Sequence, residues 1–472
     1  MVQDWRMYRL FALLVLGGCA VPAQPLRLHP ANPHYYEFRG KPTVLITSAE
    51  HYGAVLNGAF DSIRYLDTLA ADGMNLTRVF MGVYRETEKD FGIFRNTLAP
   101  SDQDFISPWT ADGRSWNEAY FRRLKDFVAQ AGRRGIVVEI TLFCTYYGEH
   151  LWKISPLYRA DVAYTDALTL KYPDLVRRQQ EFVRKVVGEL RDFDNVLYEI
   201  CNEPYFAGVS LEWQALIAKT IVEAESRFPI RHLIAQNIAN HHQRVTNLDP
   251  NVSVLNFHYA RPPVTVALNY DWNRVIAFDE TGFDGTMDAA YRIQGWEFLI
   301  AGGAHYNNLD YSFAVGHEDG SQRVGGDQPG GGGASLRKQL KTLATFLSQF
   351  DFIRMKPDPN IVLSVTPADT SVTALAEAGK QYAVYLHHGK VLADHRPRYA
   401  VRTSRQTATL TLQLPPGTYV ARWWNPRTGQ IEVTETFPHS GSSKPLTSPV
   451  YQEDLALELK RQSAGVQAGI VR

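Results

Sequence analysis

Short apolar segments alternate with helical segments between residues 43 and 350, and this alternation limits the possible folds more than any other feature. The apolar segments are predicted strands, at Thr43–Ser48, Gly73–Phe80, Gly135–Phe143, Asn195–Ile200, His232–Gln236, Val252–Phe257, Arg274–Asp279 and Gly302–Phe313. Between them, apolar residues recur with the helical period, as in Asp61–Asp72. Eight strands that alternate with helices predict an α/β fold, a (β/α)8 TIM barrel with parallel strands.

From about Pro357 the apolar residues recur with a period of two, which is typical of half-buried strands. Pro-Gly and Thr-Gly pairs separate these segments, as expected for tight turns. We therefore predict a small antiparallel β-sandwich. The predicted organisation is an export signal at residues 1–24, the barrel at 25–354 and the sandwich at 355–472. Because the last barrel helix runs almost directly into the sandwich, we expect the two domains to share an interface.

The N-terminal residues have the pattern of an export signal. Arg6 and Arg9 precede the apolar run Leu10–Leu16, which is too short to span a bilayer. The residues up to Cys19 resemble a bacterial lipobox, so we expect a periplasmic or cell-surface lipoprotein, attached to the membrane only through lipidated Cys19. Cleavage after Ala23 is the alternative and would give a secreted protein.

Charge and cysteine content narrow the classes of function. Lysine plus arginine and aspartate plus glutamate both number 49, so no net charge attracts nucleic acid or an anionic membrane. A neutral substrate fits this balance. Cys144 and Cys201 lie near the ends of two neighbouring predicted strands, either as a disulfide or as two buried thiols. Their spacing matches no zinc or iron–sulfur motif.

Two glutamates follow predicted strands in equivalent positions. Glu203 stands in an Asn-Glu-Pro sequence after Asn195–Ile200, and Glu280 follows Asp279 at the end of another strand. They are 280 − 203 = 77 residues apart, which suits three successive β/α units. The carboxyl ends of barrel strands carry active-site groups, so both side chains are candidate catalytic residues. The alternative for Glu203 is structural, as an acidic residue that favours a helix start.

An Asn-Glu-Pro that ends strand four and a glutamate that ends strand seven resemble the clan A glycoside hydrolases, which include the family 5 cellulases and mannanases. The resemblance implies a retaining double displacement, with Glu203 as acid/base and Glu280 as nucleophile. This chemistry needs one protonated and one ionised carboxyl group. Arg78 matches the arginine that these enzymes keep beside the nucleophile. We expect apolar surroundings and the charge of Glu280 to raise the pKa of Glu203.

Further site residues follow from the same resemblance. Asn202 would donate to the 2-hydroxyl of the sugar, and His258 and Tyr259 would bind the sugar or hydrogen-bond to the nucleophile. Glu50, His51 and Tyr52 follow the first predicted strand and are placed where a sugar could be bound, with loop structure as the alternative. The expected partner is a carbohydrate, a poly- or oligosaccharide, and the reaction needs neither a metal nor a cofactor.

The last predicted strand departs from family 5. Those enzymes commonly end it with a tryptophan, whereas this chain offers His305 and Asp310 as binding groups. Trp152 is a candidate stacking platform for a sugar, with local packing as the alternative. The order of an NPxYxxxxGKP-like segment, a barrel and a sandwich with a WxxPRTG-like strand also resembles the apiosidase-like glycosidases.

Two other classes of function are weighed against this one. A metal-dependent barrel hydrolase would need a His-x-His pair at the end of strand one, and only His51 stands there. A non-catalytic carbohydrate-binding surface lipoprotein on a glycosidase-like barrel would tolerate the loss of either glutamate, and both are present. The glycine-rich segment Gly316–Gly333 lacks the Lys-Ser or Lys-Thr of a phosphate-binding loop and is predicted to be a mobile loop.

Overall fold

The computed structural model describes residues 24–392 and 399–462, so Cys19 lies outside the described residues. The larger of the two parts of the molecule is built around a parallel sheet, with the strands in the order β4-β11-β10-β9-β8-β7-β6-β5. The strands are β4 (Leu45–Ala49), β5 (Leu76–Phe80), β6 (Val137–Cys144), β7 (Val196–Asn202), β8 (Leu233–Asn240), β9 (Val254–His258), β10 (Val275–Thr281) and β11 (His305–Leu309). The two edge strands meet at Asn75, whose backbone N–H donates to the Ile46 carbonyl (3.3 Å) and whose side chain accepts from Ile46 N–H (2.8 Å). The predicted (β/α)8 barrel is confirmed.

Helices surround this sheet. They are α1 (Ser62–Asp72), α2 (Glu118–Arg133), α3 (Glu149–Lys153), α4 (Pro173–Leu190), α5 (Leu211–Ala224), α6 (Val264–Asn269), α7 (Asp288–Ile300) and α8 (Ala334–Leu347), with 3₁₀ turns η1 (Tyr164–Asp166), η2 (Tyr270–Trp272), η3 (Phe352–Arg354) and η4 (Pro359–Ile361). Helix α1 begins after Asp61, whose carboxylate accepts from two backbone N–H groups of the first turn, and ends at Gly73 with φ 79°. Among the described residues, no helix combines the length and apolar character needed to cross a bilayer.

A three-stranded antiparallel sheet covers the amino-terminal end of the barrel. It consists of β1 (Arg27–His29), β2 (Asn32–Phe38) and β3 (Lys41–Thr43). Tyr35 and Tyr36 of β2 share a buried cluster with Leu45, Leu76 and Val137, which stand at the starts of barrel strands. The amino-terminal end of the barrel is therefore filled with packed side chains.

The C-terminal part has antiparallel sheets and a core of its own. A six-stranded sheet has the order β12-β14-β15-β22-β19-β20, a three-stranded sheet has the order β13-β18-β21, and β16 pairs with β17. The strands are β12 (Lys356–Pro357), β13 (Val362–Thr366), β14 (Ser371–Glu377), β15 (Gln381–His387), β16 (Gly389–Val391), β17 (Tyr399–Val401), β18 (Thr409–Leu414), β19 (Gly417–Trp424), β20 (Ile431–His439), β21 (Ser442–Thr447) and β22 (Asp454–Arg461). Leu386, Leu412 and Trp423 come from both larger sheets and are buried in one cluster. The predicted β-sandwich is confirmed.

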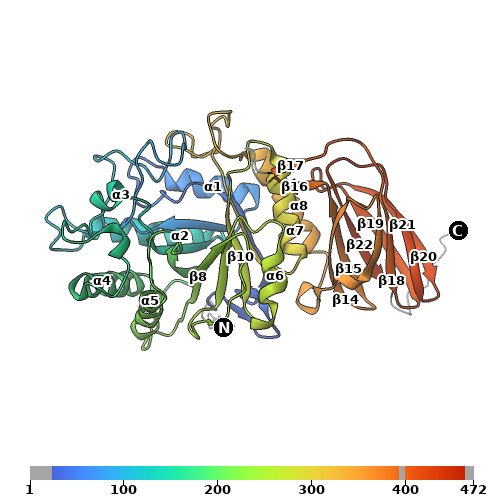
Figure 1. Ribbon diagram of the computed structural model, residues 1–472, viewed down its shortest axis with the longest axis horizontal. Helices are drawn as coiled ribbons and strands as arrows, with labels where there is room; N and C mark the ends of the chain where they lie inside the picture. Colours follow the sequence, from blue (N-terminus) through green and yellow to red (C-terminus); the bar gives the residue numbers. More distant parts are fainter. Residues whose placement is uncertain (1–23, 393–398, 463–472) are drawn as a thin grey trace, which may run out of the picture.

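Helix α7 connects the two parts, and Figure 1 shows α7 and α8 between the barrel strands and the sandwich. All residues of α7 after its first are buried. Trp296 stacks on Tyr385 of β15 with ring centroids 5.4 Å apart. Arg292 donates to Asp454 (2.8 and 2.9 Å) and to Glu453 (2.7 Å). Such charge-assisted hydrogen bonds fix the orientation of one part against the other.

The glycine-rich loop at 316–333 packs on the barrel, which does not fit the prediction of a mobile loop. Glu318 accepts from the backbone N–H of Asp61 (3.2 Å), and Gly333 N–H donates to Asp310 (3.1 Å). A Cβ at Gly330 would lie 1.4 Å from the carbonyl oxygen of Gly282. Glycine is needed here because it permits this close approach of two backbones.

Candidate active site

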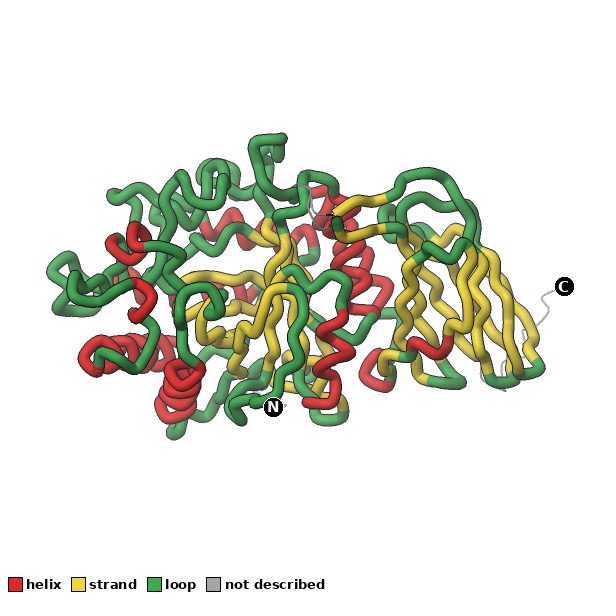
Figure 2. Tube along the Cα trace, viewed as in Figure 1, coloured by secondary structure: helices red, strands yellow, loops and turns green. Residues whose placement is uncertain are grey.

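A cavity of about 660 Å³ opens at the carboxyl ends of the barrel strands. Figure 2 shows long loops at this end of the barrel, along the upper edge of the view. Every barrel strand, or the loop that follows it, contributes to the lining. The lining residues are His51, Tyr52, Phe80, Glu86, Phe91, Leu98, Tyr147, Asn202, Glu203, Phe206, Asn240, His241, Tyr259, Arg261, Glu280, Phe283, Gly285, Gly326, Gln328 and Pro329. The volume lies in the range of sites for small ligands.

Two of the lining carboxylates, Glu203 and Glu280, lie close together. Glu203 follows the last residue of β7 and Glu280 is the penultimate residue of β10; they are 7% and 6% exposed. His258 lies between them, with Nδ1 3.2 Å from Glu203 Oε1 and 3.5 Å from Glu280 Oε1. One carboxylate oxygen of each glutamate and one His258 nitrogen lie within 4.8 Å of one another. Both carboxyl groups can therefore act on one bond.

Glu203 is held by its backbone and by hydroxyl donors. Its N–H donates to the Asn237 side chain (2.8 Å), and its φ of 45° lies in the left-handed region, which costs a non-glycine residue free energy. The hydroxyls of Tyr147 and Tyr205 (3.3 Å) donate to its carboxylate. Burial raises the pKa of Glu203, but the hydrogen bond and charge of His258 outweigh burial and lower it. This corrects the expectation of a raised pKa.

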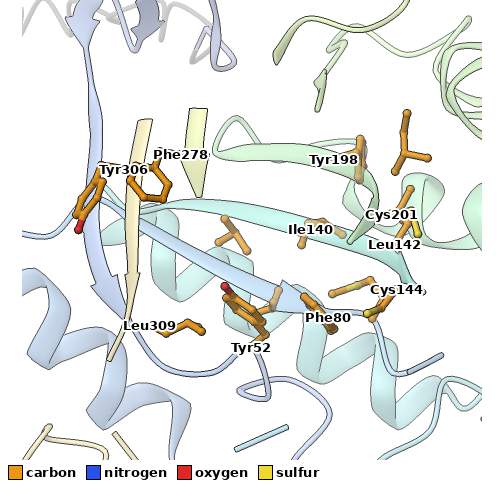
Figure 3. Close-up of a cluster of buried hydrophobic side chains, with 14 of the residues drawn as sticks. Tyr52, Phe80, Ile140, Leu142, Cys144, Tyr198, Cys201, Phe278, Tyr306 and Leu309 are labelled. Carbon is orange, nitrogen blue, oxygen red and sulfur yellow. The ribbon is translucent and has the colours of Figure 1, made fainter. Parts of the chain in front are cut away.

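Glu280 has a different set of partners. The hydroxyl of Tyr52 donates to its Oε2 (3.0 Å), and that of Tyr259 donates to Oε1 (2.7 Å). Arg78 Nη1 lies 3.4 Å from Oε2. Tyr52 lies beside Phe80 in Figure 3, with stacked rings 4.8 Å apart. Tyr52 and Tyr259 both have a positive φ, 58° and 49° respectively. Strained residues of this kind cluster at functional sites.

Arg78 is fully buried at the centre of an acidic cluster next to the pocket. Its Nη2 donates to Glu199 (2.5 Å) and to Asn202 Oδ1 (2.7 Å), and its Nε lies 3.2 Å from Asp279. His258 Nε2 approaches Asp279 from the other side, at 3.1 Å. Burial alone would raise the pKa of Asp279, but Arg78 and His258 lower it below its ordinary value. The pKa of Arg78 is raised by these carboxylates in spite of burial.

Two sets of described residues could offer ligand atoms to a metal ion. They are Glu199, His258 and Asp279, and Glu203, His258 and Glu280. The guanidinium of Arg78 already contacts both carboxylates of the first set. His258, which belongs to both sets, has a pKa well above its ordinary value, because nearby carboxylates outweigh its burial. A protonated imidazole has no lone pair for a metal, so the protein's own cations balance these charges.

Three more of the predicted residues, Asn202, His51 and Tyr259, line the pocket. The Asn202 amide donates to the hydroxyl of Tyr147 (3.0 Å). His51 Nε2 lies 3.3 Å from the Glu86 carboxylate, and its Nδ1 is buried without a hydrogen-bond partner within the part of the chain that the structure describes. His51 follows β4, and Asn202 ends β7, with β5 and β6 between these two strands in the ring.

Trp152 and Glu50, both predicted to bind sugar, lie outside the pocket lining. Trp152 is fully buried and its indole N–H donates to the Val162 carbonyl (2.8 Å). Trp152 therefore packs in the core, which was the alternative to stacking on a sugar. Glu50 is also fully buried, and its carboxylate accepts from the backbone N–H groups of Gly53 (2.9 Å) and Ala54 (3.0 Å). It shapes the turn after β4, so the prediction of a sugar contact was wrong.

His305 and Asp310 are the other two corrections. His305 begins β11, so it lies at the filled end of the barrel; its Nδ1 is 3.2 Å from the Tyr36 hydroxyl and its Nε2 3.4 Å from Glu139. Burial lowers the pKa of His305 to about 4. Asp310 is buried and pairs with Arg337 (2.7 Å). Both residues stabilise the barrel and neither reaches the cavity.

The sequence indicated Tyr52 only as a possible sugar contact and gave no role to Tyr147, Glu199 or Asp279. Tyr52 and Tyr147 donate to the two carboxylates, and their signal was weak, since each stands in a cluster of polar or aromatic residues at a strand end. Glu199 and Asp279 pair with Arg78 inside apolar strands. A charged residue within an apolar strand needs a partner, which is the signal that could have identified this cluster.

Cys144 and Cys201 are buried free thiols, the second of the two alternatives for this pair. Burial raises the pKa of both thiols, so they are protonated and unreactive. Cys144 Sγ lies 3.4 Å from the side-chain nitrogen of Asn202. It therefore packs behind a residue of the pocket wall.

The chain is similar to known proteins in sequence and in fold. Residues 37–254 match the family model described as Cellulase (glycosyl hydrolase family 5). A solved structure described as a glycoside hydrolase is similar over 93% of this chain and 97% of its own, with TM-score 0.63 and 12% identity. A glycoside hydrolase family 5 protein from Bacteroides vulgatus is similar over 94% of this chain and 95% of its own, with TM-score 0.62 and 12% identity. No curated protein sequence matches the chain.

The solved structures establish the fold, and the family model carries the enzyme class. The matched range includes Glu203 and ends at the first residue of β9, before Glu280. The family model confirms the predicted resemblance to clan A and the predicted class, a glycoside hydrolase that acts on carbohydrate. The alternative of a non-catalytic carbohydrate-binding lipoprotein finds no support.

Proposed function

We propose that this glycoside hydrolase cleaves O-glycosidic bonds of a poly- or oligosaccharide with retention of configuration, with Glu280 as nucleophile and Glu203 as acid/base. The observation that supports this best is the closeness of the two carboxyl groups, which offer oxygens within 4.8 Å of each other. Retaining enzymes hold these groups about 5–5.5 Å apart, whereas inverting enzymes need about 6.5–9.5 Å to admit a water. The pair therefore suits direct attack by one carboxylate.

Glu280 is the better nucleophile of the two. Hydroxyl groups of Tyr52 and Tyr259 donate to it, and Arg78 lies 3.4 Å away. These donors hold the carboxylate in place, and the guanidinium offsets its negative charge. One of its oxygens bonds to the anomeric carbon while the bond from that carbon to the leaving oxygen breaks. The products of this step are a glycosyl ester on Glu280 and the released alcohol.

Glu203 must carry a proton when the leaving group departs, and His258 is its source. The pKa of His258 is raised above its ordinary value, and its Nδ1 lies 3.2 Å from Glu203 Oε1. Transfer of this proton turns an imidazolium–carboxylate pair into a neutral pair with no change in total charge. A bound sugar displaces water from the cavity, and the lower local dielectric favours the neutral pair.

In the second step Glu203 acts as the base. Its carboxylate takes a proton from a water molecule while that water attacks the anomeric carbon of the ester. The bond to Glu280 breaks, and two inversions at one carbon give overall retention. The hydroxyls of Tyr147 and Tyr205 hold the Glu203 carboxylate in position for both steps.

Proton NMR of the first product tests the mechanism. A panel of aryl glycosides and plant polysaccharides identifies a sugar that is turned over, and spectra taken before mutarotation should show the anomer of the substrate. The opposite anomer would replace the proposal by an inverting one. Glu149 is an exposed carboxylate on α3 outside the proposed site, so Glu149→Gln should keep full activity.

We also propose export as a lipoprotein. Mass spectrometry of the mature protein from its native host should show an acylated N-terminal Cys19. A free terminus at Gln24 would instead indicate ordinary cleavage and a secreted protein.

A further inference from the structure

Two loops meet across the carboxyl end of the barrel and close one side of the cavity. The side chain of Gln328, in the loop between β11 and α8, pairs with the backbone of Phe94, in the loop between β5 and α2. Its Nε2 donates to the Phe94 carbonyl (2.9 Å) and its Oε1 accepts from Phe94 N–H (3.2 Å). Gln328 is only 5% exposed and lines the cavity. This pairing is called the clasp below.

The clasp is anchored on both sides. In one loop, Glu318 accepts from the backbone N–H of Asp61 (3.2 Å), and a side chain at Gly330 would overlap the backbone that follows β10. In the other loop, the hydroxyl of Thr97 donates to the carbonyl of His51 (2.9 Å). Neither loop can swing away without leaving buried polar groups unpaired, which costs free energy.

The strand order separates the clasp from Glu203. The clasp joins the loops after β11 and β5, which flank β4 in the closed ring, and β7 is four strands from β11 and two from β5. Inside this wall stand His51 and Glu86, both buried. His51 Nε2 lies 3.3 Å from the Glu86 carboxylate, and both side chains line the cavity.

The side next to Glu203 is open and aromatic. Phe206 is 57% exposed and Tyr205 37%. The rings of Phe206 and Phe91 lie 5.9 and 5.1 Å from that of Tyr147, which donates to Glu203. Exposed apolar rings at the mouth of a cavity offer stacking faces to a ligand that extends outward.

We propose that the enzyme removes terminal sugar units from the non-reducing end of its substrate and does not cut within chains. The inference rests on the proposed function, because it uses Glu203 as the acid. The acid protonates the leaving oxygen, so the leaving group lies on the open side, over Phe206. The sugar that is transferred then extends the other way, toward His51, Glu86 and the clasp. A chain that continued from that sugar would have to pass through the clasp.

Paired substrates that differ only at the non-reducing end test this inference. Turnover of an aryl glycoside, abolished by Glu280→Ala, first checks the proposed function independently and identifies the sugar. Oligosaccharides of that sugar then carry a fluorophore at the reducing end and either a free or an O-alkylated non-reducing terminus. The free form should shorten one unit at a time, and the alkylated form should remain intact. Equal cleavage of both forms, or internal fragments from the start, would overturn the inference and leave the retaining mechanism untouched.

A pair of variants tests the clasp itself. Gln328→Ala removes both hydrogen bonds to Phe94, whereas Gln322→Ala removes a contact to Arg95 (3.3 Å) between the same loops but outside the cavity lining. The first variant should begin to cleave the alkylated oligosaccharide, and the second should reject it as the wild type does. A Gln328→Ala protein of unchanged melting temperature that still rejects the alkylated form would show that the clasp is not the wall.

Discussion

Glu203 and Glu280 are similarly buried and both lie near His258, but Glu280 has a second cation beside it and Glu203 does not. Glu280 lies beside Arg78, whose guanidinium stays protonated at any working pH. The charged neighbour of Glu203 is His258, which can gain or lose a proton. A permanent cation suits a carboxylate that must stay ionised, and a titratable neighbour suits one that must change its charge in each cycle. The comparison shows how one type of side chain can perform two roles.

The largest expected effect separates the two roles directly. Glu280→Ala should lower kcat/KM about 10⁴-fold or more on every substrate, because no covalent intermediate can form. Glu203→Ala should lose much less on aryl glycosides whose leaving group needs little protonation. Rates across a series of aryl leaving groups check this. Near-full activity of Glu280→Ala would show that Glu280 is not the nucleophile.

Removal of the permanent cation should affect stability as well as activity. Arg78→Met leaves buried carboxylates unpaired, so the free energy of unfolding should fall by about 3–5 kcal/mol in urea titrations. Arg177→Met, which breaks an exposed ion pair on α4, is the control and should change it by less than about 1 kcal/mol. Equal stability of the two variants would show that the acidic cluster does not depend on Arg78.

Titration of His258 should contribute to the pH dependence of the free energy of unfolding. The pKa of His258 is raised in the folded protein, so its contribution is fully present below the ordinary value of 6.5 and is lost as pH rises through the folded value. The unfolding free energy of the wild type should therefore decline above about pH 6.5, and His258→Asn should remove part of this decline. His242→Asn, at an exposed site after β8, is the control and should keep the wild-type profile. An unchanged profile in His258→Asn would contradict the raised pKa.

The smallest expected effect compares two tyrosine hydroxyls. Tyr52 donates to Glu280 at 3.0 Å and is buried, whereas Tyr205 donates to Glu203 at 3.3 Å and is partly exposed. Loss of a buried hydrogen bond to a charged group costs about 1.5–3 kcal/mol, so Tyr52→Phe should reduce kcat/KM tenfold or more. Tyr205→Phe should stay within about threefold. If steady-state kinetics showed a larger loss of kcat/KM in Tyr205→Phe than in Tyr52→Phe, the hydrogen bond to Glu203 would be the more important of the two.

The barrel and both carboxylates could be predicted from the sequence because they depend on local patterns. Alternating strands and helices define a barrel, and a glutamate that ends a parallel strand must lie at its carboxyl edge. The direction of a side chain in the residues that follow a strand has no such pattern. His51 lines the cavity whereas its neighbour Glu50 turns into the protein, and the positive φ of Tyr52 helps set this local path.

Contacts between distant segments were also out of reach. Gln328 and Phe94 are 234 residues apart in the chain, and nothing in either segment indicates the other. The pKa of Glu203 was predicted in the wrong direction for the same reason, because it depends on the exact placement of His258, which is 55 residues away. Charge within a barrel is set by tertiary neighbours more than by the strand that carries the residue.

Azide rescue tests the division of roles most directly. In Glu203→Ala, azide can attack the glycosyl ester on Glu280 without the help of a base, so added azide should restore turnover of an aryl glycoside and give a glycosyl azide of retained configuration. The configuration follows from proton NMR of the product. Rescue of Glu280→Ala as a glycosyl azide of inverted configuration would agree with the same account. A glycosyl azide of inverted configuration from Glu203→Ala would contradict it and make Glu203 the nucleophile.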